Sequence, residues 1–452
     1  MAIQDSVIVI VDPYSTGALV SLEAFNRGYT VIALWTDEEG GYRGHNPPQV
    51  SADVEAKIYT AQVEQQSARL DGMAAALREA AGSRSIVALI CGGESGVKVT
   101  DALSEHMGLR GNGTGLSNRR DKRVQQDAVR RSGLRAVREA CGTTWAEVSS
   151  FLETESLPVV VKPVESAGSD GVKLCRTKQE AEAHFKLLMT SQRKLGAQGA
   201  AVLVQEFLAG EEFVIDQVTR DDEHKTVMVW VYEKAPANGA QFVYYNMRPV
   251  PSDSAVARQL VAYTSGCLDA IQIRNGATHS EVMMTADGPC LVEVNCRCGG
   301  FNGSWVPLAT ALTGYSQVTC LLDAFVDDAA YDALPSLPAA PFKMAGCNPF
   351  LVSKQEGVAR AAPGFDAIAK LPSCVSVDAA VTVGDTQRKT IDLFTQPGQC
   401  VLVHADPEVV EADIRAIRKL EDEGLFFEVA EAPEEAAVEG GVKPSGTVAG
   451  AA

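Results

Sequence analysis

The chain has 452 residues, which is too long for one compact core and suggests roughly three domains. Hydrophobic residues make up 46% and charged residues 22%, as in an ordinary globular protein. The net charge of −18 argues against a nucleic-acid-binding surface, because such a surface needs a cationic face. No apolar stretch reaches the roughly 18 residues that a membrane span requires.

The N-terminus resembles a first strand and lacks the basic and cleavage regions of a signal peptide. The 11 cysteines are an odd number, scattered along the chain, which fits reduced thiols better than a disulfide framework. We therefore expect a cytoplasmic, enzyme-sized protein that binds small molecules and contacts neither nucleic acid nor membrane.

The first part of the chain alternates strand and helix signals. Residues 6–12 form an apolar, β-branched run typical of a strand in a parallel sheet. A turn follows, then a helical stretch that Gly28 ends and a second strand at 30–34. A further strand at 86–91 leads through Gly92-Gly-Glu-Ser-Gly96 into a helix that reaches about His106. This order predicts a Rossmann-like α/β domain over residues 1–115.

The remainder of the chain mixes strands and helices, so we expect an α/β (α+β) protein. A basic helical stretch at 118–133 opens a second part, 116–335, with strands at 159–162, 171–175, 202–206, 212–219, 226–232, 279–284 and 289–295. A third, strand-rich part, 336–430, has strands at 375–383 and 400–404, and Asp406 caps a helix that runs to about Asp422. Residues 431–452 have almost no large apolar side chains, which predicts a disordered tail.

The first chemical signal is a strand that ends in Lys162 and is followed by a loop rich in Gly and Ser. Such a loop can lie close over phosphates, while the lysine neutralises their charge. It is not a Walker A loop, because it lacks the Gly-Lys-Ser/Thr ending and precedes a strand. A plain hairpin with a flexible turn is the competing interpretation.

The second signal is a pair of short strands that carry Glu281 and Glu293, joined by a turn at 286–289. Glu293, Asn295 and Arg297 alternate with apolar residues, so the three share one face. Such a face suits oxygen ligation of Mg²⁺ beside a guanidinium that binds phosphate. A solvated strand face is the alternative, but the Gly-rich turn that follows favours the metal site.

The third signal is the segment 204–214, which contains Glu206-Phe-Leu208 and a Gly turn before Glu212. A purine ring needs apolar walls and hydrogen bonds from a chain segment, and ribose hydroxyls need a carboxylate acceptor. By itself this signal is weak.

In their order along the chain, these signals resemble the ATP-grasp superfamily over about residues 1–430, most specifically at 118–325. The resemblance implies an ATP-grasp fold with an N-terminal Rossmann-like domain and a C-terminal strand-rich subdomain. It also implies ATP and Mg²⁺, or Mn²⁺ in its place, as cofactors. Relatives of this kind are often dimers, so a homodimer is an expectation.

The resemblance also implies roles for individual residues. The phosphates of ATP would meet Lys122, Lys162 and a flexible loop that includes Ser166, Ser169 and Gly171. The base would meet Glu206, Phe207 and Leu208, and the ribose would meet Glu212. The metal ions would be held by Glu281, Glu293 and Asn295, with Arg297 and Lys162 acting on the transferred phosphate.

Within the superfamily the chain is similar to L-amino-acid ligases that form dipeptides and to carnosine synthase-like enzymes. This rests on four less specific motifs, which begin at Val11, Gly92, Gly113 and Gly276. The similarity implies that Glu94 and His279, with Arg297, lie beside the substrate, where the first two would hold an α-ammonium group. A surface-loop acid and a structural histidine remain open as alternatives.

We therefore expect an ATP- and Mg²⁺-dependent carboxylate–amine ligase that works through an acyl-phosphate, with at least one amino-acid substrate. A ligase of non-amino-acid substrates in natural-product biosynthesis is the alternative, and a nucleotide-binding protein without turnover is a weaker one. A nicotinamide enzyme is disfavoured, because Gly17 stands alone where Gly-x-Gly-x-x-Gly is needed. Cys296 and Cys298 lack a second pair at zinc-ligand spacing and are interpreted as ordinary small residues.

Overall fold

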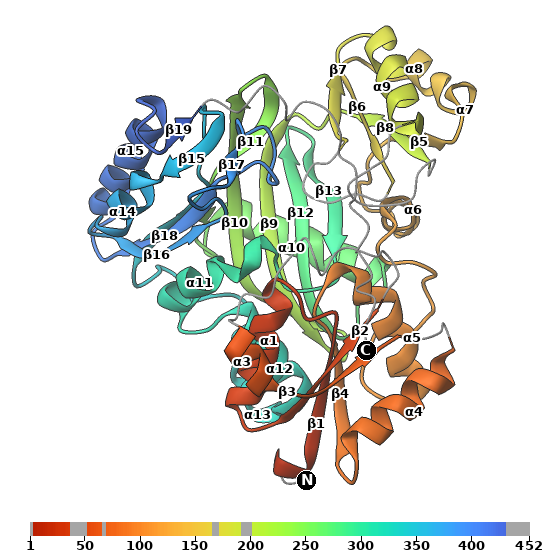
Figure 1. Ribbon diagram of the computed structural model, residues 1–452. Coiled ribbons are helices and arrows are strands. Elements are labelled where there is room, and N and C mark those ends of the chain that lie inside the picture. Colours follow the sequence, from red (N-terminus) through yellow and green to blue (C-terminus); the bar gives the residue numbers. More distant parts are fainter. Residues whose placement is uncertain (1–2, 37–51, 66–68, 165–170, 191–200, 431–452) are drawn as a thin grey trace, which may run out of the picture.

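The computed structural model describes residues 3–36, 52–65, 69–164, 171–190 and 201–430 (Figure 1). The expected tail at 431–452 and the loop residues Ser166 and Ser169 lie outside this described part. Within it, no helix combines the length and apolar character needed to cross a membrane.

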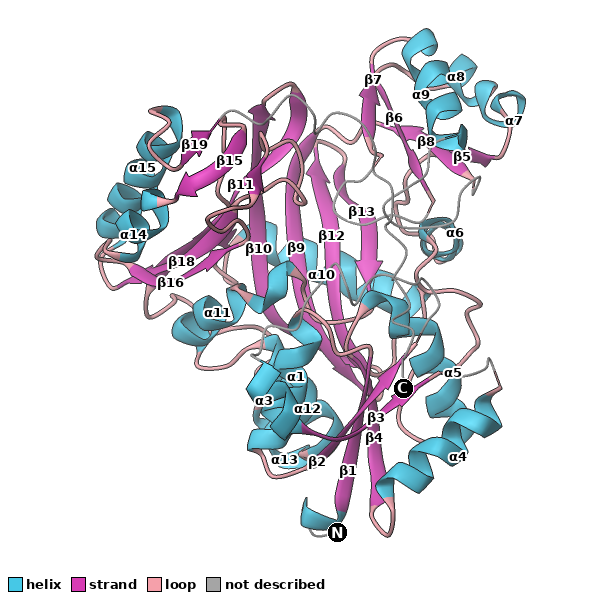
Figure 2. Cartoon of the chain, viewed as in Figure 1, coloured by secondary structure: helices cyan, strands magenta, loops and turns pink. Residues whose placement is uncertain are grey.

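The N-terminal part is a parallel sheet with the strand order β3-β2-β1-β4, covered by helices on both faces (Figure 2). Every residue of β1 is buried, as its unbroken β-branched run predicts. Ile8 and Ile10 pack toward α1, while Val7 and Val9 pack toward α4 and α5. This confirms the predicted α/β character of this part. Its elements are β1 (Ser6–Val11), α1 (Thr16–Asn26), β2 (Thr30–Trp35), α3 (Ala52–Ile58), β3 (Tyr59–Glu64), α4 (Leu70–Ala81), β4 (Ser85–Cys91), η2 (Glu94–Gly96) and α5 (Val97–Met107).

A small four-stranded sheet stands apart at the upper right of Figure 1, with the strand order β5-β8-β6-β7. It has its own apolar core, in which Val159 and Val161 of β6 pack against Phe185 of α9. Helix α6, whose N-cap Asp121 accepts bonds from two backbone N–H groups, precedes it. The elements are α6 (Lys122–Arg131), β5 (Glu139–Gly142), α7 (Trp145–Ser149), α8 (Phe151–Thr154), β6 (Val159–Pro163), β7 (Lys173–Cys175), α9 (Lys178–Thr190) and β8 (Val202–Glu206).

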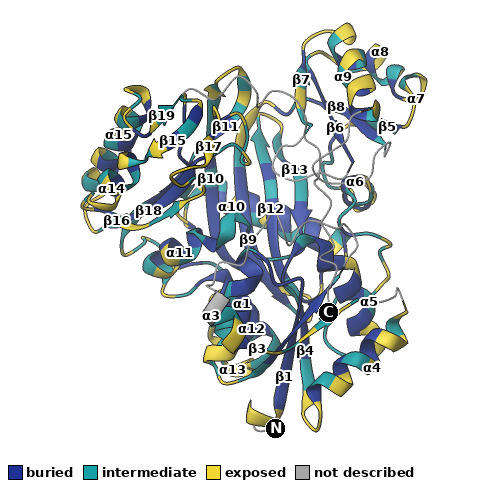
Figure 3. Cartoon of the chain, viewed as in Figure 1, coloured by how far each residue is buried: buried dark blue, intermediate teal, exposed yellow. Residues whose placement is uncertain are grey.

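The centre of the molecule is an eight-stranded sheet with the order β13-β12-β9-β10-β11-β14-β18-β16. Its strands are among the most deeply buried parts of the chain (Figure 3). Helix α10 packs against strands β9, β10, β12 and β13 of this sheet. Helix α12 packs on β9 and also on α1 of the N-terminal part. The elements are β9 (Gly210–Arg220), β10 (Glu223–Ala237), β11 (Ala240–Pro249), α10 (Ala255–Ala270), β12 (Gly276–Thr285), β13 (Gly288–Asn295), η3 (Phe301–Gly303), α11 (Trp305–Thr313), α12 (Gln317–Val326) and α13 (Asp328–Ala333).

The C-terminal part shares this central sheet. Strand β14 (Ala345–Pro349) pairs with β11, and β18 (Gly398–His404) and β16 (Cys374–Ala379) extend the sheet beyond it. Strands from both sides of the expected boundary at residue 336 therefore lie in one continuous sheet. Asp406 caps its last helix as predicted, because its carboxylate accepts a bond from the Glu408 N–H. The remaining elements are β15 (Gly357–Ala361), α14 (Pro363–Ala369), β17 (Thr386–Gln387), α15 (Pro407–Asp422) and β19 (Glu428–Ala430).

Candidate active site

A cavity of about 970 Å³ lies where the N-terminal part, the small sheet, the central sheet and the C-terminal part meet. It brings together most of the side chains singled out in the sequence. The cavity is lined by Glu94, Lys122, Lys162, Phe207, Leu208, Glu212, His279, Glu281, Glu293, Asn295 and Arg297. Glu206 and Gly171 are described residues that do not line it.

The two acids proposed for metal binding face each other across the β12–β13 hairpin. Glu281 and Glu293 are register partners, and Asn295 lies two residues further along the same face of β13. Burial, reinforced by the nearby carboxylates of Glu293 and Glu212, raises the pKa of Glu281 to about 7. Burial would also raise the pKa of Glu293, but the Lys122 ammonium outweighs it and lowers that pKa. Glu293 therefore ionises readily, while Glu281 holds its proton more tightly than an ordinary glutamate.

Two lysines stand beside these acids. The Lys122 Nζ lies 2.5 Å from Oε2 of Glu293, which couples the start of α6 to β13. Lys162, at the end of β6, is buried, and burial together with the charge of Lys122 lowers its pKa to about 8. A buried ammonium with a lowered pKa gains most when an anionic ligand arrives, as a phosphate would.

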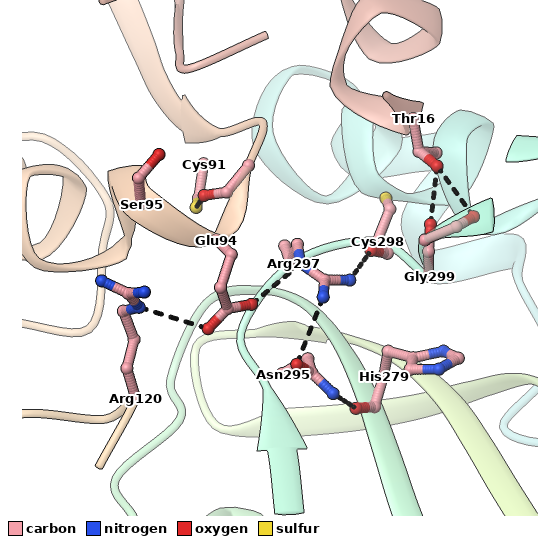
Figure 4. A network of polar contacts seen from close by, with 12 residues as sticks. Thr16, Cys91, Glu94, Ser95, Arg120, His279, Asn295, Arg297, Cys298 and Gly299 are labelled. Atoms are coloured by element: carbon pink, nitrogen blue, oxygen red, sulfur yellow. Dashed lines mark hydrogen bonds and ion pairs between the residues drawn. The ribbon is translucent and has the colours of Figure 1, made fainter. Parts of the chain in front are cut away.

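Arg297 lies just beyond β13 and is held in place by several contacts (Figure 4). Its Nε lies 2.9 Å from Oε2 of Glu94, and its terminal nitrogens donate to Oδ1 of Asn295 and to the Cys298 carbonyl. The other oxygen of Glu94 lies 3.3 Å from Nε of Arg120. The Glu94 carboxylate thus already faces two guanidinium groups. The structure places it with Arg297 in the cavity, and its role toward an ammonium group stays a prediction.

His279 is buried and lines the cavity, with both ring nitrogens in contact with protein groups. Its Nδ1 lies 2.8 Å from Oδ1 of Asp216, and its Nε2 lies 3.3 Å from the Tyr232 hydroxyl. Asp216 also accepts a bond of 2.7 Å from Nε1 of Trp230. An acceptor carboxylate at Nδ1 favours a proton on that nitrogen. The imidazole is therefore oriented by its neighbours, and its contact with a substrate remains a prediction.

Only some side chains of segment 204–214, which is expected to bind the nucleoside, line the cavity. Phe207 and Leu208 line the cavity. The Glu206 carboxylate instead accepts from the Arg138 N–H and pairs with the Arg138 guanidinium at 2.7 Å, so this side chain is engaged outside the cavity. Glu212 lines the cavity, but both of its oxygens lie 2.7 Å from Nζ of Lys234.

The loop after β1 is hydrogen-bonded, through Ser15 and Thr16, to the Gly-rich turn after Arg297. The Thr16 hydroxyl donates to the Gly299 carbonyl at 2.6 Å, as Figure 4 shows. Ser15 donates to the Asn302 side chain and accepts from the Asn302 N–H. A Cβ on Gly17 would lie 2.5 Å from the Gly92 carbonyl oxygen, so the two N-terminal loops can meet only with glycine there. Two of the less specific motifs of the sequence thus form one wall of the cavity.

A family model described as an ATP-grasp domain matches residues 155–304. Dapdiamide A synthase of Enterobacter agglomerans is 29% identical over 347 residues, which are 75% of this chain and 80% of that protein. Alanine–anticapsin ligase of Bacillus subtilis (strain 168) is 25% identical over 265 residues, covering 54% of this chain and 55% of its own. An L-amino acid ligase from Bacillus licheniformis superposes with a TM-score of 0.72 at 17% identity, over 95% of this chain and 99% of that one.

The chain contains an ATP-grasp domain, and its relatives support a C–N bond-forming ligase. This confirms the resemblance, the fold class and the C–N ligase class inferred from the sequence.

Several lining residues of this ligase were not singled out in the sequence. Tyr232 and Lys234 come from β10, Tyr244 from β11, and Asp378 and Gln399 from the C-terminal strands. Lys234 also lies over the Tyr244 ring, 4.0 Å from its centroid. No local motif marks these residues, since they come together only when distant strands pair.

Proposed function

We propose that this ligase phosphorylates a substrate carboxylate with ATP and then joins the acyl group to an amine, with an amino acid as at least one substrate. The observation that carries this is the cluster of Glu281, Glu293, Lys122, Lys162 and Arg297 within one cavity. The two acids can bind a metal cation and the three basic side chains can bind phosphate groups, and phosphoryl transfer requires both.

The residues present fit a magnesium ion. The side chains of Glu281, Glu293 and Asn295 supply the hard oxygen ligands that Mg²⁺ prefers. In the described part of the chain no three His, Cys, Asp or Glu side chains cluster as a metal site, so the third oxygen would have to be the amide of Asn295. When bound, the ion would neutralise charge on the phosphate oxygens. Burial raises the pKa of Glu281, so a cation bound beside this carboxylate would stabilise its charged form.

The proposed reaction has two steps, which the protein serves mainly by positioning and electrostatics. A carboxylate oxygen of one substrate attacks the γ-phosphorus of ATP, the bond to the bridging oxygen breaks, and ADP leaves. The amine of the second substrate then attacks the acyl carbon, phosphate leaves, and the amine loses a proton to give an amide. Lys162 and Arg297 would bind the transferred phosphoryl oxygens, while Glu94 and Asn295 hold the Arg297 guanidinium in place.

Support for an amino-acid substrate comes from two relatives. One is named alanine–anticapsin ligase, and a solved structure of the same fold is an L-amino acid ligase. The test is a phosphate-release screen of the purified chain with ATP and Mg²⁺ over pairs of amino acids. We expect release that needs both partners. Release without any acceptor amine, or no release with any pair, would contradict the proposal.

Glu94→Ala is expected to raise the KM of the amino-acid substrate far more than the KM of ATP. Removing this carboxylate leaves Arg297 and Arg120 without their shared partner and removes a negative charge from the part of the cavity where we expect the amino acid to bind. Initial rates with each substrate varied in turn give the two KM values, and Glu105→Ala on the outer surface of α5 is a control of the same charge change. Equal effects on both KM values would argue against a substrate role for Glu94.

A des-amino analogue separates the two roles open to Glu94. If Glu94 binds the ammonium group directly, removing that group from the substrate should harm the wild type much more than Glu94→Ala. If Glu94 only positions Arg297, the analogue should be disfavoured equally by both proteins.

A further inference from the structure

Gln399 on β18 is a buried amide with one half of its hydrogen-bonding capacity used. It is 5% exposed and lines the cavity. Its Nε2 donates to the Phe301 carbonyl at 2.9 Å and to Oδ2 of Asp378 at 3.2 Å. Both partners accept only, so the amide nitrogen, and not the amide oxygen, must be the atom that contacts them. Within the described part of the chain, that oxygen, Oε1, has no donor.

A buried acceptor without a donor is disfavoured, and a ligand that brings an N–H group relieves that penalty. Asp378 stands next to this acceptor, because Asp378 and Gln399 are register partners in β16 and β18, and it also lines the cavity. Like Glu211 and Glu281, it forms no ion pair with any residue that the structure describes, whereas the cavity acids Glu94, Glu212 and Glu293 each do. Asp378 is therefore a cavity carboxylate whose charge is not matched by a protein cation.

We propose that Asp378 and Gln399 form a subsite for the ammonium group of an amino-bearing substrate. The carboxylate supplies the charge and the amide oxygen supplies a directed acceptor, which together suit a group with three N–H donors. The rings of Tyr244 and Phe301, 6.2 Å apart between centroids, line the same cavity, and aromatic faces add attraction for a cation. The inference rests on the proposed function and names the residues that recognise one of its substrates.

The ammonium group could belong to the substrate that supplies the carboxylate or to the substrate that supplies the attacking amine. The experiment therefore measures KM for each amino acid in turn, with ATP and the other partner saturating, using an amino-acid pair that the wild type joins. Asp378→Asn keeps the shape of the side chain and removes its charge, and Gln399→Leu keeps its size and removes the acceptor.

We expect each variant to raise the KM of one and the same amino-acid substrate by roughly 10-fold or more, with the KM of ATP unchanged. The substrate affected identifies which partner carries the recognised ammonium. Wild type should discriminate strongly against the des-amino analogue of that substrate, and Asp378→Asn should discriminate much less. Asp366→Asn, an exposed acid on α14 of the same part, is the matched control and should change no KM.

Unchanged KM values in Asp378→Asn, or equal rises for ATP and both substrates, would overturn the subsite. If Gln399→Leu does not fold, Asp378→Asn alone decides, because the partly buried Asp378 side chain tolerates a change to an amide of the same shape. Failure of the proposed function is distinguishable, since it appears as a wild type that releases no phosphate with any pair. Failure of the subsite appears as an active wild type whose Asp378→Asn variant matches it.

Discussion

Glu293→Gln is expected to lower kcat for ATP consumption by roughly 100-fold or more. The substitution keeps the size of the side chain and leaves an amide oxygen facing Lys122, so the chain should still fold. It removes one negative charge from the Glu281–Glu293 pair, which our proposal assigns to Mg²⁺. Phosphate release at several Mg²⁺ concentrations measures the effect, and we expect the variant to need more Mg²⁺ than the wild type.

Asp287→Asn is the matched control for this variant. Asp287 lies in the turn of the same hairpin, its side chain is 85% exposed, and it makes a long contact of 3.9 Å with Arg135. The same loss of charge should therefore leave phosphate release unchanged. Near wild-type turnover of Glu293→Gln at saturating Mg²⁺ would refute the metal assignment.

Lys162→Ala is expected to weaken ATP binding by roughly 10- to 100-fold and to lower turnover with it, because a charge-assisted contact to phosphate is lost. Titration calorimetry with ATP measures the affinity. Lys173→Ala, an exposed lysine on the neighbouring strand β7, removes the same charge outside the cavity and should bind ATP as the wild type does. Unchanged affinity in Lys162→Ala would make Lys162 a structural lysine at the end of a strand.

The lowered pKa of Lys162 adds a pH signature to this test. With a pKa of about 8 in the free protein, Lys162 is charged below that pH and becomes neutral above it. ATP prefers the charged form, so wild-type affinity should fall as the pH rises through 8, while the bound phosphates keep the proton on the lysine. Lys162→Arg stays charged and should lose this dependence between pH 7 and 9. The same pH slope in Lys162→Arg would assign it to another group.

Local patterns in the sequence were enough to predict several helices and strands and the hairpin at the centre of the candidate site. The β1 run and the cap at Asp406 are encoded by neighbouring residues, and the structure has both. The hairpin that carries Glu281 and Glu293 could also be predicted, because its two strands are joined by a short turn and the alternation of side chains sets their face. The sequence carries one more local signal of this kind. Asn238-Gly239 links β10 to β11, and this dipeptide is typical of a tight hairpin.

Only the tertiary structure decided which distant residues complete the cavity. The pairing of β11 with β14 joins the C-terminal strands to the central sheet and carries Asp378 and Gln399 to the cavity. The direction of the Glu206 side chain depends on Arg138, and the Glu94–Arg297 contact joins residues about 200 positions apart. Strand pairing and ion pairs over such separations depend on which surfaces are buried together, and that depends on the whole fold rather than on neighbouring residues.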